Sequence, residues 1–152
     1  MRHIFAAVVA VLCMGTAIAD EPAACYISHD PTGDFASSDV QPSEALPGVG
    51  AQVRHLMNQD NRAFGRCMQK HVEREGTWPS GAGILYGARI SPEGKVTQVS
   101  VLASRNINDA LLMACVGRLI CKWELEPSAD NKERLIAVPP FGTPERLFNS
   151  KY

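Results

Sequence analysis

The feature that most constrains the fold of this chain is a pair of alternating segments, residues 83–90 and 95–103, on either side of a Pro-x-Gly turn. Pro92 presets its own backbone angle, and Gly94 can take a positive φ without steric cost. In each segment a set of apolar residues shares one face: Ile84, Tyr86, Ala88 and Ile90 in the first, and Val99, Val101 and Ala103 in the second. This period of two predicts a β-hairpin. Because Val96 is out of phase with Val99, we also predict a bulge near Thr97 or Gln98.

The first 19 residues have the layout of a secretory signal peptide. Arg2 precedes an apolar run from Ile4 to Ala19, which ends in an A-x-A site just before Asp20. The run is shorter than the roughly 20 residues that span a bilayer, so a retained membrane anchor is the weaker interpretation. We therefore predict cleavage after Ala19 and a periplasmic or secreted protein.

The composition excludes several classes of protein. A hydrophobic fraction of 45% with 20% charged residues is typical of a globular chain and not of a disordered one. The net charge of −1 offers no general attraction for nucleic acid. The chain beyond the cleavage site is long enough for one domain with its own core.

Four cysteines lie beyond the predicted cleavage site: Cys25, Cys67, Cys115 and Cys121. An even number in an exported chain indicates two disulfides, for which three connectivities are possible. Cys115 and Cys121 do not form the C-x-x-C motif of thiol oxidoreductases.

The chain divides into an arm, a domain and a tail. Residues 20–50 contain several prolines and glycines without a sustained period, which predicts an irregular N-terminal arm. Cys25 would tie this arm to the domain if it is paired. The domain is predicted over residues 51–140, and residues 141–152 form a C-terminal tail.

Residues 52–75 predict an amphipathic helix, because apolar side chains recur with helical spacing and Gly76 suits the position after the helix end. The opposite side carries basic residues at intervals of four: Arg62, Arg66, Lys70 and Arg74. This basic stripe is a candidate docking face for an acidic partner or lipid headgroups. A solvated helix face is the simpler interpretation.

A second helix is predicted over residues 110–122, after a segment with N-cap residues at Asn106 to Asp109. A short strand, residues 135–138, follows and is stopped by Pro139-Pro140. The order helix, hairpin, helix, strand predicts an α+β fold. We expect a three-stranded sheet with both helices on one face, in which the last strand pairs with the first and runs parallel to the second.

This topology places the two predicted helices side by side, which brings Cys67 and Cys115 within reach of each other. Closing that loop would contribute roughly 4 kcal/mol by the chain-entropy estimate. Cys25 and Cys121 would form the remaining pair. The alternative is that one of the latter two is unpaired and reactive.

The sequence contains few residues in catalytic patterns. His29, His55 and His71 are scattered singly, without the spacing of a metal site. No G-x-S-x-G elbow or other activated nucleophile is present. We predict no metal, no cofactor and no catalysis.

Two segments together resemble the C-terminal domains of the TonB superfamily. The first is the glycine-led strand and turn, Gly83-Ile84-x-Tyr86-x-x-x-Ile90-Ser91-Pro92-Glu93-Gly94-Lys95-Val96-x-x-Val99-x-Val101. The second is similar to the helix and W-x-F-x-P segment of that superfamily: Leu112-x-x-Cys115-Val116 through Trp123-x-Leu125-x-Pro127. With Cys67 upstream, the chain most resembles the AgmX/PglI C-terminal branch, over about Val53 to Val138.

The resemblance implies a periplasmic protein-binding module that pairs an edge strand with an envelope protein or peptide. The predicted topology places that edge at Leu135, Ile136, Ala137 and Val138. Pro139 and Pro140 would limit its length, which is equally how a monomer protects an edge from aggregation. The short arm and cleavable signal depart from TonB itself, which is anchored and spans the periplasm. Two alternatives stay open: a thiol-active protein using Cys25 or Cys121, and a secreted effector or inhibitor.

Overall fold

The computed structural model describes residues 24–28, 35 and 39–141 of the chain. The predicted signal peptide and most of the predicted tail lie outside these residues. The described chain contains three α-helices, one 3-10 turn and five strands. In order they are β1 (Tyr26–Ser28), β2 (Gln41–Pro42), η1 (Ser43–Ala45), α1 (Val49–Gln59), α2 (Asn61–Glu75), β3 (Gly83–Ile90), β4 (Val96–Arg105), α3 (Ala110–Ile120) and β5 (Arg134–Phe141).

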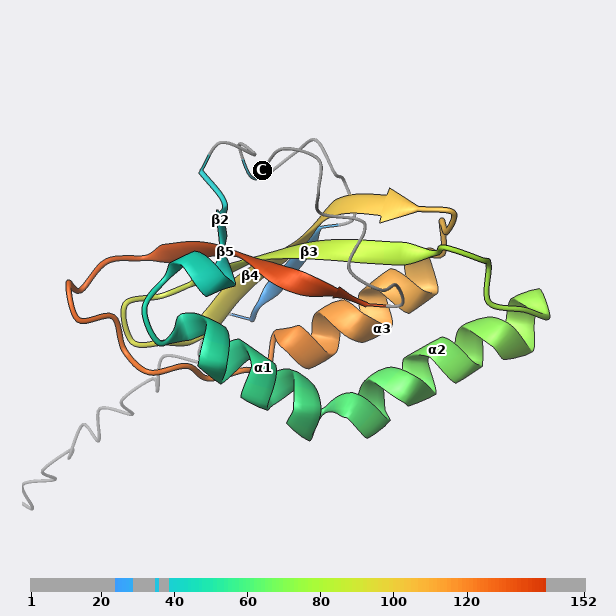
Figure 1. The fold of residues 1–152 in the computed structure, drawn as a ribbon, viewed down its shortest axis with the longest axis horizontal. Coiled ribbons are helices and arrows are strands. Elements are labelled where there is room, and N and C mark those ends of the chain that lie inside the picture. Colours follow the sequence, from blue (N-terminus) through green and yellow to red (C-terminus); the bar gives the residue numbers. More distant parts are fainter. Residues whose placement is uncertain (1–23, 29–34, 36–38, 142–152) are drawn as a thin grey trace, which may run out of the picture.

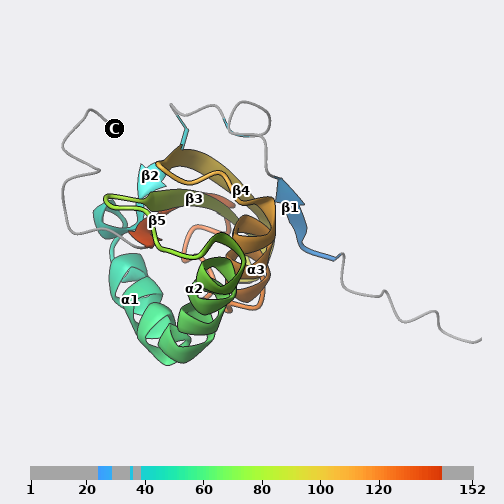
Figure 2. The same ribbon diagram turned by 90° about the vertical axis from the view of Figure 1, so that its right-hand side faces the viewer.

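The strands form one mixed sheet in the order β1-β4-β3-β5-β2. The three α-helices lie on one face of this sheet (Figure 1), and the view from the side shows the two layers (Figure 2). The α+β class is therefore confirmed. The predicted three-stranded sheet is wrong in number, because the segment expected to be an irregular arm supplies both outer strands. The predicted central arrangement is present, since β3 pairs antiparallel with both β4 and β5.

The hairpin follows the predicted pattern closely. Arg89 pairs with Gln98 and Ile90 pairs with Val96, so Thr97 is the extra residue of a bulge at the predicted place. Gly94 has φ 92°, and a Cβ atom on it would lie 2.0 Å from the carbonyl oxygen of Leu125. The turn thus needs glycine both for its backbone angle and for its close approach to the segment after α3.

The single helix predicted over residues 52–75 is in fact two helices that meet at Asp60. This residue has φ −89° and ψ 3°, outside the helical range, and serves as the last cap of α1 and the first of α2. Its carboxylate accepts a hydrogen bond of 2.9 Å from the indole N–H of Trp123. The break therefore coincides with a tertiary contact. Apolar periodicity continues across it, which is why the sequence pattern alone does not reveal it.

The core lies between the sheet and the helices. Tyr86 is fully buried there, and its hydroxyl donates to the carbonyl oxygen of Met113 at 3.2 Å. Burial raises the pKa of this phenol. The other fully buried large side chains are Ile84, Ile90, Leu112, Ile120, Ile136, Val53, Val99, Val116 and Val138. The predicted apolar face of the hairpin is thus buried, except at Ala103. That residue is exposed, because a second register shift, between Leu85 and Tyr86, places it opposite Leu85.

Both disulfides expected from the topology are present. Cys67 bonds to Cys115 with an S–S distance of 2.04 Å and joins α2 to α3. Cys25 bonds to Cys121 at 2.07 Å and fixes the start of β1 beside the end of α3. These bonds are typical of a chain that folds in an oxidising compartment. With Cys25 and Cys121 joined, the described residues contain no free thiol for the thiol-active alternative.

Candidate functional site

The strand predicted to form the binding edge is not an open edge. β2 pairs in parallel with β5, with Gln41 opposite Ile136 and Pro42 opposite Ala137. Ile136 and Val138 point into the core, with exposures of 1% and 0%. The prediction that Leu135–Val138 is the free outer edge is therefore wrong, because the N-terminal segment returns to the sheet and lies along it.

β2 is a minimal cover for β5. It contains two residues, both exposed to solvent, and Pro42 has no backbone N–H to donate. The chain after it is held more firmly, since Ser43 is buried and Glu44 forms an ion pair with Arg54 of α1. β2 is thus held in place at its C-terminal end by η1, and its two residues themselves add little to the stability of the sheet.

β5 also extends further than predicted. It runs to Phe141, through the two prolines expected to stop it. Val138 pairs with Tyr86 and Phe141 pairs with Ile84, so Pro139 and Pro140 fall at an irregularity in the ladder. A bulge tolerates residues that cannot donate to the ladder. The prediction that the strand ends at Val138 is therefore wrong.

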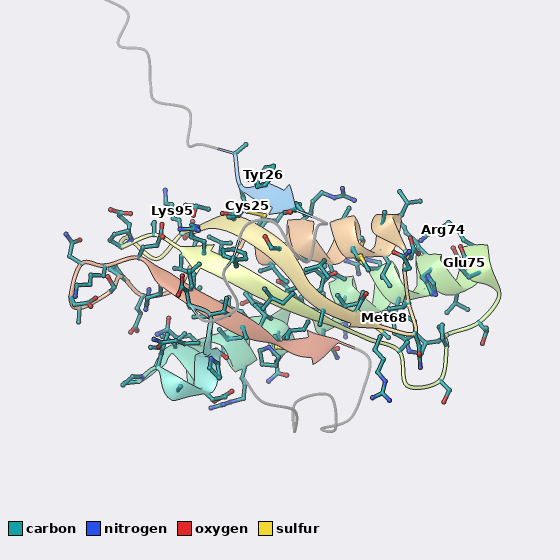
Figure 3. The ribbon with its side chains drawn as sticks, turned by 90° about the horizontal axis from the view of Figure 1, so that it is seen from above. Cys25, Tyr26, Met68, Arg74, Glu75 and Lys95 are labelled. Atoms are coloured by element: carbon teal, nitrogen blue, oxygen red, sulfur yellow. A yellow bond between two sulfur atoms is a disulfide. The ribbon has the colours of Figure 1, made fainter. Side chains whose placement is uncertain are left out.

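The opposite edge of the sheet is held covalently. β1 pairs in parallel with β4, with Tyr26 opposite Gln98 and Ser28 opposite Ser100. Figure 3 shows Tyr26 on this outer strand and Cys25 just before it, and Tyr26 is 59% exposed. Ile27 packs on Gly117, where a Cβ atom would lie 3.1 Å from it. The Cys25–Cys121 disulfide then makes β1 a permanent part of the sheet.

Phe35 lies in sequence between β1 and β2, which stand at opposite edges of the sheet. The guanidinium of Arg89 lies 5.4 Å from the centre of the Phe35 ring. Arg89 alternates with the core residues Ala88 and Ile90, so Phe35 is on the face away from the helices. The predicted arm is therefore packed against the domain at this point.

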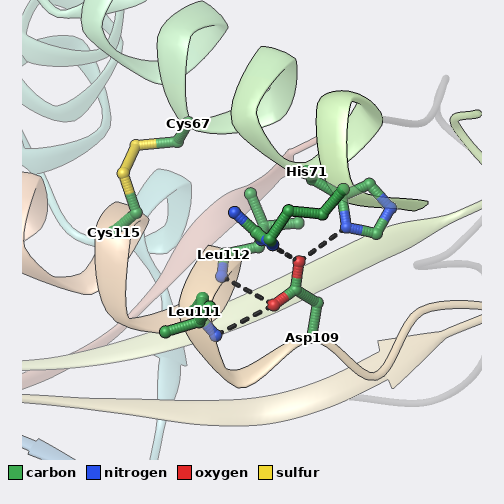
Figure 4. A network of polar contacts seen from close by, with 7 residues as sticks. Cys67, His71, Asp109, Leu111, Leu112 and Cys115 are labelled. Atoms are coloured by element: carbon green, nitrogen blue, oxygen red, sulfur yellow. Dashed lines mark hydrogen bonds and ion pairs between the residues drawn. A yellow bond between two sulfur atoms is a disulfide. The ribbon is translucent and has the colours of Figure 1, made fainter. Parts of the chain in front are cut away.

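A network of polar contacts joins the end of α2 to the start of α3 (Figure 4). Asp109 is the N-cap of α3, and its Oδ1 accepts from the backbone N–H groups of Leu111 and Leu112 at 2.9 and 3.1 Å. Its other oxygen contacts His71 Nδ1 at 2.6 Å and forms an ion pair with Arg74. The sequence predicted the cap from residues 106–109 but did not predict the two partners on α2.

The environment of Asp109 favours its ionised form. Burial by itself raises the pKa of this carboxyl, but the hydrogen bonds from His71 and Leu112 together with Arg74 outweigh it and lower the pKa to about 2. The carboxylate therefore stays charged across the physiological range and links two helices. This is a structural role.

The two histidines of the described residues, His55 and His71, belong to no group of potential metal ligands. His71 is buried against Trp78, and its Nε2 atom has no hydrogen-bond partner among the described residues. His55 is exposed on α1, and His29 lies outside the described residues. No group of three potential metal ligands occurs in the described part of the chain.

The predicted basic stripe of α2 is changed at one end. Arg74 is engaged by Asp109, with its side chain 34% exposed, so it is not available as part of a docking face. Arg62, Arg66 and Lys70 are exposed, as predicted. The stripe therefore has three members on α2 instead of four.

A shallow hollow, not predicted from the sequence, lies between α1 and the segment after α3. Its volume is about 480 Å³. Gln52 spans it, accepting from the backbone N–H of Glu126 at 2.7 Å. The lining residues are Ala51, Gln52, His55, Leu56, Glu124, Leu125 and Glu126. Only the tertiary contact between two distant segments creates this hollow, and no local pattern marks it. It contains no pairing of a nucleophile with a base.

None of the helices in the described ranges is long and apolar enough to cross a membrane. The resemblance to the TonB superfamily stays a prediction. Comparison of the chain with protein-family models, with curated proteins and with solved structures finds no match.

Proposed function

We propose that this chain is an exported, non-catalytic module that binds an envelope protein by strand addition along the outer edge of β5. β2 is then a placeholder that the partner strand replaces. The observation that supports this is the difference in length between the two strands. β5 has eight residues, whereas β2 covers it with two.

The exchange is energetically reasonable. Gln41 and Pro42 are both exposed, so releasing them uncovers little apolar surface. A longer partner strand would form more backbone hydrogen bonds with β5 than β2 does, and backbone bonds supply most of the affinity in strand addition. The other edge is less suitable, because β1 is fixed by the Cys25–Cys121 disulfide.

Two opposite substitutions in β2 test this mechanism. Gln41→Gly weakens the placeholder, because glycine disfavours strands. Pro42→Thr strengthens it, because threonine restores a backbone N–H and has a β-branched side chain. We expect capture of the partner from an envelope extract to rise severalfold for Gln41→Gly and to fall severalfold for Pro42→Thr.

Matched controls are available in the exposed loop before β5. Asn131→Gly likewise replaces an amide side chain by glycine, at a residue whose φ of 54° glycine adopts readily. Pro127→Thr repeats the other change, also at an exposed position away from the sheet edge. Both controls should bind like the parent.

Circular dichroism and thermal unfolding of all five proteins establish that each is folded. If the two β2 variants and the two controls capture the same partner equally, the β5 edge is not the binding site. The origin of the captured partner separates an envelope module from a secreted effector or inhibitor.

A further inference from the structure

The helices α2 and α3 lie side by side and run in opposite directions. Cys67 is bonded to Cys115, while Arg74, further along α2, contacts Asp109 at the start of α3. These two contacts show that α2 and α3 are antiparallel. Figure 2 shows the pair together on the helical side of the molecule.

The disulfide sets the orientation of the side chains around it. Lys70 lies three residues after Cys67 on α2, and Arg118 lies three residues after Cys115 on α3. Side chains three or four residues apart in a helix share a face. Arg66 adjoins this face, Arg62 lies one turn before Arg66, and Lys122 follows just beyond α3. Five exposed basic residues thus lie on α2, on α3 and just after α3: Arg62, Arg66, Lys70, Arg118 and Lys122. We call them the basic face.

No ion pair within the described residues joins a member of the basic face to a carboxylate, whereas several other arginines of the domain are paired. Arg54, Arg74 and Arg89 each form an ion pair, with Glu44, Asp109 and Glu133 respectively. Within residues 24–28, 35 and 39–141, no ion pair involves a member of the basic face. Glu73 lies on the same side of α2 as Arg66 and Lys70. Its carboxylate accepts a hydrogen bond of 2.9 Å from the side chain of Gln69. Among the described residues, no ion pair therefore neutralises the positive charge of this face.

We propose that the basic face binds the anionic headgroups of a lipid surface. Clusters of four to eight basic residues on an amphipathic helix are typical of such binding. The charges are spread over the outer side of two neighbouring helices, which suits an extended charged surface. The hollow described above lies elsewhere, beside α1. Leu111, on the same side of α3, is 63% exposed and can enter the interfacial region of a bilayer.

Co-sedimentation of the exported chain with vesicles tests the proposal. We expect binding to vesicles of phosphatidylglycerol and phosphatidylcholine at low salt, little binding to phosphatidylcholine alone, and release as salt screens the charges. Each basic residue near an anionic surface contributes roughly fivefold to partitioning. The variant Arg66→Gln/Lys70→Gln/Arg118→Gln should therefore bind about 100-fold more weakly.

The matched control removes three charges from exposed residues that are not members of the basic face: Lys95→Gln/Arg105→Gln/Lys132→Gln. It has the same net charge as the first variant and should retain most of the binding. Leu111→Ser keeps all charges and should lower binding severalfold. Equal losses in the two triple variants would overturn the proposal, because attraction would then follow net charge alone. Absence of binding to anionic vesicles at low salt would also overturn it, and binding to poly-L-glutamate in that case would assign the face to an acidic polypeptide instead.

Discussion

Trp123 donates its indole hydrogen bond to Asp60 at the point where α1 ends and α2 begins, with a distance of 2.9 Å between nitrogen and oxygen. The Trp123 side chain is only 2% exposed, and its ring stands edge-on to Phe64 with centroids 6.3 Å apart. The segment after α3 therefore holds the junction between two helices that adjoin in sequence. This contact joins residues 60 and 123, which no local pattern connects.

Replacing Asp60 should destabilise the domain through Trp123. In Asp60→Ala the buried indole N–H loses its acceptor, and an unsatisfied buried donor costs about 1–3 kcal/mol. We expect the free energy of unfolding, measured with urea, to fall by about 2 kcal/mol. Asn58→Ala, at an exposed position near the end of α1, is the control and should change it by less than about 0.5 kcal/mol. Equal stability of the two variants would show that the hydrogen bond contributes nothing.

The stability of the domain should depend on pH through Asp109. Its pKa is lowered from the ordinary value of 3.8 to about 2 in the folded state, so folding favours the ionised form. The resulting stabilisation is complete above about pH 4 and is lost as pH falls through the folded pKa. It amounts to about 2 kcal/mol.

Asp109→Asn isolates this contribution, because asparagine keeps the helix cap but has no charge. Urea unfolding at pH 6 and at pH 2 should show a smaller loss of stability on acidification in the variant than in the parent. Other carboxyl groups titrate in both proteins, so their effects on the free energy of unfolding cancel in the comparison. Identical pH dependence of the two proteins would contradict a role for Asp109.

Removing each disulfide should destabilise a different part of the domain. Cys67→Ala/Cys115→Ala removes a bond between residues 48 apart in sequence that joins two helices of the core. We expect the free energy of unfolding to fall by about 4 kcal/mol. Cys25→Ala/Cys121→Ala instead releases β1, a three-residue strand at the edge of the sheet.

Hydrogen exchange distinguishes these effects. In Cys25→Ala/Cys121→Ala the loss of protection should centre on β1 and its partners Gln98 to Ser100 in β4. In Cys67→Ala/Cys115→Ala it should spread through α2, α3 and the strands beneath them, because the core loosens as a unit. A global loss in both variants would mean that β1 is essential to the whole fold.

Two glycines should respond in opposite directions to the same substitution. Gly94→Ala places a Cβ atom 2.0 Å from the carbonyl oxygen of Leu125 at a φ of 92°. We expect this variant to lose about 3 kcal/mol of stability, since both strain and a backbone clash have to be relieved. Gly65→Ala lies in α2 with no atom within 4 Å of the added methyl group. It should gain about 0.5–1 kcal/mol, measured by thermal or urea unfolding.

The sequence alone determined the central part of this fold. Period-two alternation and the Pro92–Gly94 turn are local signals, so the hairpin, a bulge near Thr97 or Gln98 and an N-cap within residues 106–109 follow from neighbouring residues. The order of elements then places α2 beside α3 and predicts the Cys67–Cys115 bond. The basic residues of α2 were likewise visible as a period of four.

Only the tertiary structure decided the edges of the sheet and the shape of the surface. β2 has two residues and β1 has three, too few to produce a recognisable alternation, so their pairing with β5 and β4 depends on contacts across the fold. The break at Asp60 coincides with the hydrogen bond from Trp123, and Arg74 of the basic stripe is engaged in an ion pair with Asp109. Each of these features joins segments distant in sequence. Periodicity reports only which face a residue occupies, and the partner on that face is set by packing.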